Sequence, residues 1–287
     1  MNTSPLSIAV VQCRLDGTRQ DNLARIERWI REAARRGAQL ILTPELFEGP
    51  YFPQHERAED RKLAAPLHDH PTLGAMRALA EELEVVLPIS IYEEDGDARY
   101  NSLVTIDADG RSLGVYRKSH IPDGPGYEEK FYFHPGNTGF RAWDTRVGRI
   151  GAGVCWDQWF PESARAMALL GAEVLLYPTA IGTEPATPEE DSRDPWRRVM
   201  IGHAVANATP LAAANRTGVE EALTFYGSSF ICDHRGEMIA ELGRKEEGVA
   251  VATIDREALA RYRNNWDFMR DRRPDLYETL VSDDTRD

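Results

Sequence analysis

The chain contains 287 residues, 42% of them hydrophobic, with 47 Asp and Glu against 34 Lys and Arg and hence a formal net charge of −13. This composition excludes a disordered chain, and no apolar run approaches the roughly 20 residues of a spanning helix, which excludes an integral membrane protein. The excess of acid argues against nucleic-acid binding, which needs a basic face, and mildly favours a cationic partner.

Short apolar strands alternate with amphipathic helices along the chain, and the two halves have a similar order of elements. In the first half we expect strands at 7–11, 39–43 and 85–92, helices at 22–36 and 72–84, and a hairpin of 100–107 with 112–116. In the second half we expect strands at 149–155, 173–177, 210–214 and 248–254, helices at 161–170, 196–207 and 256–263, and a hairpin of 225–232 with 237–242. The pattern predicts an α/β layered fold in one domain with internal pseudo-symmetry.

The segment after residue 262 differs from the rest of the chain, because Trp266, Phe268 and Tyr277 stand among many charged residues. Aromatic and Arg enrichment is typical of protein interfaces. We therefore divide the chain into a domain at 1–262 and a C-terminal tail at 263–287 that contacts another subunit. The alternative is a tail that packs on its own domain.

Three cysteines, Cys13, Cys155 and Cys232, are too few and too far apart for a disulfide framework or a zinc site. This usage favours a reducing compartment, and we expect the protein in the cytoplasm. Cys155 differs from the other two because it ends an apolar strand and begins the turn into the helix at 161–170. Backbone N–H groups at such a turn can lower a thiol pKa and hold an oxyanion. Cys13 and Cys232 are interpreted as buried packing residues.

A nucleophilic cysteine needs a base, and no histidine occupies the ends of the neighbouring strands, which argues against a Cys-His pair. Glu45 follows the strand at 39–43, and Lys118 follows the strand at 112–116. Because the carboxyl ends of parallel strands gather at one edge of a sheet, these two side chains and Cys155 can converge there. The alternative is that Glu45 and Lys118 simply close their strands, as charged residues often do.

The sequence offers little for cofactor chemistry. Neither a dinucleotide-binding nor a P-loop glycine pattern follows a strand, and the histidines do not have the spacing of a metal-binding helix. His68 and His70 flank one aspartate in a predicted loop, which is more typical of surface than of a metal site. We therefore expect no cofactor and no metal.

Three segments in order, 44–47 (PELF), 116–122 (YRKSHIP) and 153–157 (GVCWD), resemble the three catalytic blocks of the nitrilase superfamily of carbon–nitrogen hydrolases. The resemblance covers nearly the whole chain, from Ile8 to about Leu280. Further segments are similar to the N-carbamoylputrescine amidohydrolase branch: 48–54 (EGPYFPQ), 123–133 (DGPGYEEKFYF), 155–161 (CWDQWFP), 177–185 (YPTAIGTEP), 191–194 (DSRD) and 225–230 (FYGSSF).

This resemblance implies a four-layer αββα sandwich and a site in which Glu45, Lys118 and Cys155 are catalytic. It implies a further site glutamate at Glu129, with the adjacent Glu128 as the alternative. It also implies a homo-oligomer, a dimer or larger, whose contacts include the C-terminal region.

The activity implied by the branch is hydrolysis of N-carbamoylputrescine to putrescine, carbon dioxide and ammonia through a cysteine thioester, a step in polyamine biosynthesis from agmatine. The far end of that small-molecule cationic ureido substrate is an ammonium group, and burying it without a counter-charge is costly. The resemblance places Glu184 at the amine end as its anionic anchor. We expect Tyr127 and Trp156 to line the channel for the four-carbon chain.

Two departures from the branch bear on specificity. Residue 195 is Pro where the branch usually carries His, and the connection at 215–225 is shorter than usual. The alternatives are therefore a related hydrolase of another N-carbamoyl amine, a β-ureido acid or an ω-amide, or a catalytically silent binding protein on the same fold. An acid substrate would need a cation where Glu184 stands.

Overall fold

Two sheets of six strands form the centre of the protein, seen in a computed structural model that describes residues 4–282. The first sheet consists of two three-stranded halves joined by a parallel bridge between Leu40 and Val86. Its order is β14 (Gly248–Ile254), β1 (Leu6–Gln12), β2 (Leu40–Leu42), β3 (Leu87–Asp95), β4 (Ala98–Ile106) and β5 (Ser112–Arg117). The second has the order β6 (Ala142–Thr145), β7 (Gly148–Ala152), β8 (Val174–Thr179), β9 (Leu211–Asn215), β12 (Phe230–Cys232) and β13 (Met238–Glu241).

The two sheets repeat one pattern of strand pairing. From β14 to β5 the pairs are antiparallel, parallel, parallel, antiparallel and antiparallel. The same succession runs from β6 to β13. This repetition agrees with the pseudo-symmetry expected from the similar order of elements in the two halves.

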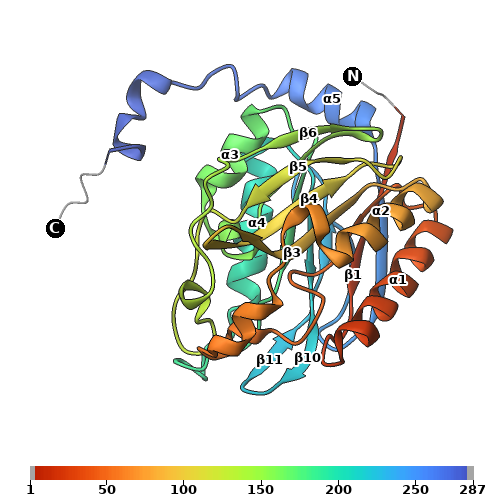
Figure 1. Cartoon of the computed structure of the whole chain (residues 1–287). Coiled ribbons are helices and arrows are strands. Elements are labelled where there is room, and N and C mark those ends of the chain that lie inside the picture. The colour runs from red at the N-terminus through yellow and green to blue at the C-terminus, as the bar shows by residue number, and fades with distance from the viewer. Residues whose placement is uncertain (1–3, 283–287) are drawn as a thin grey trace.

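Helices cover the outer face of each sheet, which confirms the predicted αββα sandwich (Figure 1). On the first sheet lie α1 (Arg19–Arg35) and α2 (Pro71–Leu83), and on the second lie α3 (Pro161–Leu169) and α4 (Arg193–Asn207). The start of α1 is fixed by a capping box between Thr18 and Asp21. Its buried residues Ile26, Ile30 and Ala33 recur at helical spacing and pack on the first sheet.

The inner faces of the sheets pack on each other through alternate strand residues. Ile8 and Val10 of β1 and Leu176 of β8 belong to this central core, whereas Ala9 and Val11 face the outer helices. Such alternation follows from the twofold periodicity of a strand. Cys13 and Cys232 are fully buried in the outer cores, as predicted for packing residues.

The second half differs from the sequence prediction in two strands. The strand expected at 149–155 ends at Ala152, which leaves Cys155 outside the sheet. The strand expected at 225–232 is divided, because Gly227 and Ser228 have φ values of +51° and +60° that no strand accommodates. Its first part is β11 (Leu223–Tyr226), which pairs with β10 (Thr217–Glu220) in a separate hairpin. That hairpin lies mostly between the predicted strands at 210–214 and 225–232, where the sequence pattern predicted neither a helix nor a strand.

The C-terminal segment runs away from the sandwich (Figure 1). Helix α5 (Arg256–Asn265) continues three residues past the predicted boundary at 262. Beyond it the side chains of Trp266, Leu276 and Leu280 are 61%, 64% and 64% exposed. Within residues 4–282, none of the helices combines the length and the apolarity that crossing a bilayer requires.

Candidate active site

Cys155 begins a short 3-10 helix (Cys155–Trp159) three residues after the end of β7. Its φ is +43°, a left-handed conformation that costs a non-glycine residue about 1–3 kcal/mol. The side chain is 5% exposed, with Sγ 3.8 Å from the carbonyl of Ala180. Burial, reinforced by the nearby carboxylate of Glu45, raises the pKa of the Cys155 thiol well above its usual value, although Lys118 opposes this. The resting thiol is therefore protonated and needs a base.

Lys118 lies directly after β5, and its ammonium joins two carboxylates. Nζ is 3.0 Å from Oε1 of Glu45 and 2.6 Å from Oε2 of Glu129, and all three side chains are inaccessible to solvent. Burial by itself would lower the pKa of Lys118, but the charges of Glu129 and Glu45 outweigh it and raise the pKa above its usual range. The site therefore holds a permanent buried cation.

The two oxygens of Glu45 have different surroundings. Oε1 accepts hydrogen bonds from Lys118 and, at 2.6 Å, from Nδ2 of Asn101. Oε2 is buried and has no hydrogen-bond partner within residues 4–282. Since a buried acceptor without a donor is costly, this oxygen is available for a proton from a thiol, a water or a substrate.

Glu129 completes the cluster from a 3-10 turn (Glu129–Phe131). Its Oε1 accepts a hydrogen bond of 2.6 Å from the hydroxyl of Tyr51. Burial and the charge of Glu45 raise the pKa of Glu129, while Lys118 and the Tyr51 hydrogen bond lower it. The structure thus places Glu129 in the cluster, whereas the neighbouring Glu128 is half-buried outside it.

The buried carboxylate of Asp157 fastens the Lys118 and Cys155 segments to each other. Oδ2 accepts from the hydroxyl of Tyr116 at 2.7 Å and from the backbone N–H of Val154 at 2.9 Å. Oδ1 accepts from the backbone N–H of His120 at 3.0 Å. Because Tyr116 and His120 flank Lys118, and Val154 precedes Cys155, one side chain holds the two catalytic segments next to each other.

Above this cluster lies a cavity of about 230 Å³. Among its lining residues are five of the predicted site residues: Cys155, Glu129, Tyr127, Trp156 and Glu184. The described residues that line it include three carboxylates, with Asp123 as the third, and neither Arg nor Lys. The cavity therefore suits a cationic ligand better than an anionic one.

The Glu184 end of the cavity is shaped by hydroxyl groups. The hydroxyl of Tyr127 accepts from the N–H of Gly182 at 3.1 Å and donates to the carbonyl of Thr183 at 3.2 Å. Ser192 donates to Oε1 of Glu184 at 3.2 Å. Burial raises the pKa of Glu184, and a bound cation would offset that shift.

All seven predicted site residues therefore meet in one place, with Glu45 and Lys118 buried in contact with the cavity-lining Glu129. Sequence reasoning did not find Tyr51, Asn101 or Asp157. Tyr51 and Asp157 stand in segments that resemble the branch, and Asn101 is a polar residue in a predicted strand. Only the folded chain shows which atoms they contact.

Known proteins resemble this chain over nearly its whole length. The sequence model of a family described as carbon-nitrogen hydrolase matches residues 7–264. An N-carbamoylputrescine amidase of Arabidopsis thaliana is 55% identical over 271 residues, which cover 92% of this chain and 91% of the relative. A citrullinase of Francisella tularensis is 50% identical, with coverage of 96% and 98%. The crystal structure of a carbon-nitrogen hydrolase from Helicobacter pylori superposes with a TM-score of 0.91 at 39% identity and covers 98% of this chain and 99% of its own.

Proposed function

The chain belongs to the carbon–nitrogen hydrolase family, and from this premise we propose that it hydrolyses N-carbamoylputrescine to putrescine, carbon dioxide and ammonia. The observation that carries the proposal is the cavity that joins Cys155 to Glu184 and is lined by carboxylates without Lys or Arg. Similarity to the N-carbamoylputrescine amidases supports the same substrate. The reaction contributes to polyamine biosynthesis from agmatine.

The first half of the reaction transfers the carbamoyl carbon to Cys155. Oε2 of Glu45 accepts the thiol proton, and the sulfur attacks the ureido carbon. Lys118 and the backbone N–H of Trp156 stabilise the oxyanion, since the first N–H groups of a helix have no partner inside it. Glu45 returns the proton to the departing nitrogen, so that ammonia leaves and a thioester of the substituted carbamic acid remains on sulfur.

The second half releases the product. Glu45 takes a proton from water, whose oxygen attacks the thioester carbon while the same oxyanion donors act again. The C–S bond breaks and the proton returns to the sulfur of Cys155. The free carbamic acid then loses carbon dioxide and leaves putrescine. Glu129 holds Lys118 in place and balances its charge throughout.

Glu184 is assigned as the anchor for the ammonium end of the substrate. We expect Glu184→Gln to raise KM for N-carbamoylputrescine by about 10- to 100-fold with a much smaller change in kcat, because a charged hydrogen bond is worth about 1.5–3 kcal/mol. Steady-state ammonia release measures both constants. Glu189→Gln, an exposed neighbour in the same loop, is the control and should leave KM within twofold. An unchanged KM for Glu184→Gln would refute the anchor.

Citrulline is a second candidate substrate, because a citrullinase is 50% identical to this chain. Its far end carries a carboxylate beside the ammonium, and the described lining residues supply no cation for a carboxylate. We therefore expect N-carbamoylputrescine to have the higher kcat/KM. A panel of N-carbamoylputrescine, citrulline, β-ureidopropionate and glutaramate distinguishes the alternatives, and no ammonia from any of them would favour a silent binding protein.

We also propose that the enzyme acts in the cytoplasm as a homo-oligomer. Three free, buried cysteines suit a reducing compartment. The exposed apolar side chains of the C-terminal segment suit an interface with another copy of the chain.

Removing the tail tests its role in assembly. In light scattering, a chain that ends before Asn264 should form particles with fewer subunits than the full chain at the same concentration. The reason is that the exposed side chains from Trp266 onward are lost. A full chain that is monomeric, or a truncated chain of the same subunit number, would contradict the interface.

A further inference from the structure

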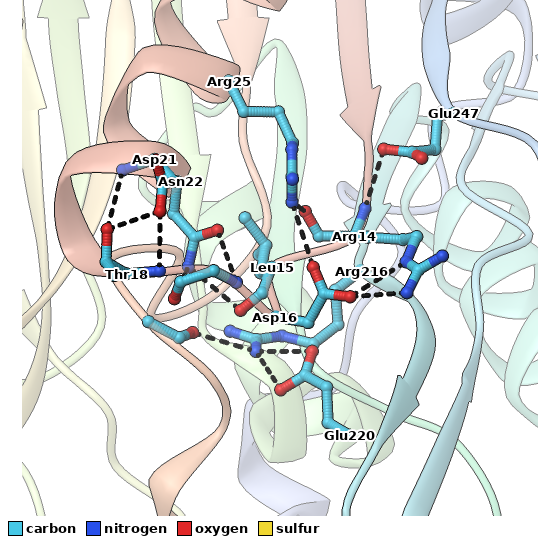
Figure 2. A network of polar contacts seen from close by, with 12 residues as sticks. Arg14, Leu15, Asp16, Thr18, Asp21, Asn22, Arg25, Arg216, Glu220 and Glu247 are labelled. Carbon is cyan, nitrogen blue, oxygen red and sulfur yellow. Dashed lines mark hydrogen bonds and ion pairs between the residues drawn. The ribbon is translucent and has the colours of Figure 1, made fainter.

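Outside the catalytic cluster, the most deeply buried ion pair within residues 4–282 joins Arg216 to Glu220. Both side chains are buried, with 0% and 2% of their surface exposed, and Nη1 of Arg216 lies 3.0 Å from Oε2 of Glu220 (Figure 2). Arg216 connects β9 to β10, and Glu220 ends β10. The pair thus belongs to the hairpin that the sequence pattern did not predict.

Arg216 holds the backbone at the catalytic glutamate. Its Nη2 donates to the carbonyls of Glu45 at 2.8 Å and Leu46 at 2.9 Å, and its Nη1 donates to the carbonyl of Gly49 at 3.3 Å. Leu46 has a φ of +46°, so the chain turns there in a conformation that a leucine does not favour. The guanidinium therefore stabilises the turn that directs the Glu45 carboxylate toward Lys118.

Glu220 is linked to Glu129, the second carboxylate beside Lys118, through Tyr51. Its Oε2 accepts from the backbone N–H of Tyr51 at 2.6 Å. The hydroxyl of the same Tyr51 donates to Oε1 of Glu129 at 2.6 Å. The ion pair is consequently connected to Glu45 through a backbone carbonyl and to Glu129 through one tyrosine.

Stability alone does not account for such a pair. Removing two charges from water costs several kcal/mol per ion, and apolar residues of similar volume are often as stable in their place. A planar guanidinium, however, carries five N–H donors in a fixed fork, so it can hold an acid and three carbonyls at once. An apolar side chain has no donor, and a lysine has three donors at a single nitrogen.

We propose that Arg216 and Glu220 are positioning residues, which place Glu45 and Glu129 on either side of Lys118 and so set how readily Glu45 takes the proton of Cys155. The inference rests on the proposed role of Glu45 as base. It does not depend on the identity of the substrate.

The test is Arg216→Lys, with Glu220→Gln as the second variant and Arg256→Lys as the matched control. Arg256 is also a buried arginine, 3.2 Å from Glu173 and bonded to the carbonyl of Val147, but it lies outside the site. Two readouts are used: steady-state kcat and KM, and the rate at which iodoacetamide alkylates Cys155 at several pH values. Thermal melting checks that each variant is folded.

For Arg216→Lys we expect kcat to fall about 100-fold, the order of loss that follows misplacement of a reacting group by about 1 Å, with KM within threefold. Alkylation of Cys155 should slow by a similar factor near neutral pH and recover at higher pH, where hydroxide replaces the base. Glu220→Gln should lower kcat and slow the alkylation of Cys155 by about 10-fold. Arg256→Lys should leave both rates unchanged.

Folded variants with wild-type kcat and alkylation rates would overturn the proposal. The proposal would also be overturned if kcat and the alkylation rate fell in proportion to the melting temperature, and to the same extent in Arg216→Lys and Arg256→Lys. If Arg216→Lys does not fold, Glu220→Gln decides by the same criteria, and failure of both to fold beside a folded Arg256→Lys would assign the pair to stability alone. Wild-type alkylation no faster than that of Glu45→Gln would instead refute Glu45 as base, and a wild type that alkylates normally but releases no ammonia would refute only the substrate.

Discussion

Replacement of Cys155 by alanine should lower kcat for N-carbamoylputrescine by a factor on the order of 10⁵ to 10⁶, which is the typical loss when a catalytic nucleophile is removed. The proposed thioester cannot form without the sulfur, and the remaining donors can only orient water. The fold should persist, because alanine is smaller than cysteine and Cys155 belongs to neither a strand nor a regular α-helix. Ammonia release at enzyme concentrations high enough to detect one turnover per hour measures the loss.

Cys232→Ala is the matched control for this experiment. Cys232 is also buried, but it lies in β12 against the outer helices and away from the cavity. We expect it to keep kcat within twofold at a cost of about 1 kcal/mol in the free energy of unfolding. Near-native turnover by Cys155→Ala would contradict the proposed mechanism.

Lys118→Met should lower both kcat and the free energy of unfolding. Loss of the ammonium leaves the carboxylates of Glu45 and Glu129 buried without a counter-charge, and breaking a buried pair from one side costs about 3–5 kcal/mol. Separately from this effect on stability, loss of an oxyanion donor should lower kcat by a factor of about 10² to 10³. Urea unfolding measures the first effect, and kcat at a temperature where the variant is folded measures the second.

Lys62→Met serves as the control, since Lys62 lies exposed on the 3-10 turn Ala58–Leu63. The free energy of unfolding should change there by less than about 0.5 kcal/mol, as is usual for surface substitutions. A Lys118→Met protein that is as stable as the control and turns over at the wild-type rate would show that the ammonium is not needed at the site.

Much of the sandwich could be predicted because its helices and strands carry local signals. Helix α1 has a regular apolar face and a capping residue, and β1 contains the continuous apolar run Ile8 to Val11. Glu45 and Lys118 were found because each follows such a strand, and the order of the catalytic blocks then linked both to Cys155. The resemblance assigned Glu129 with Glu128 as the alternative, and the structure shows that Glu129 is the one that is buried in contact with Lys118.

What the sequence could not supply depends on contacts between distant segments. Arg216 meets the carbonyls of Glu45 and Leu46 across about 170 positions of the chain, and no local pattern announces such a contact. Asn101 is likewise 56 positions from the carboxylate that it contacts. The strand expected to run through Ser228 failed for a conformational reason, since a serine with positive φ is uncommon and carries no mark in the sequence.

The most direct test of the mechanism is to trap the covalent intermediate. Wild-type enzyme is mixed with N-carbamoylputrescine, quenched with acid within milliseconds, and analysed by intact mass and by peptide mapping. We predict an adduct with the mass of the aminobutylcarbamoyl group on the peptide that contains Cys155, absent from Cys155→Ala and from enzyme quenched without substrate. Absence of any adduct while ammonia is being released, or an adduct on another residue, would contradict the account.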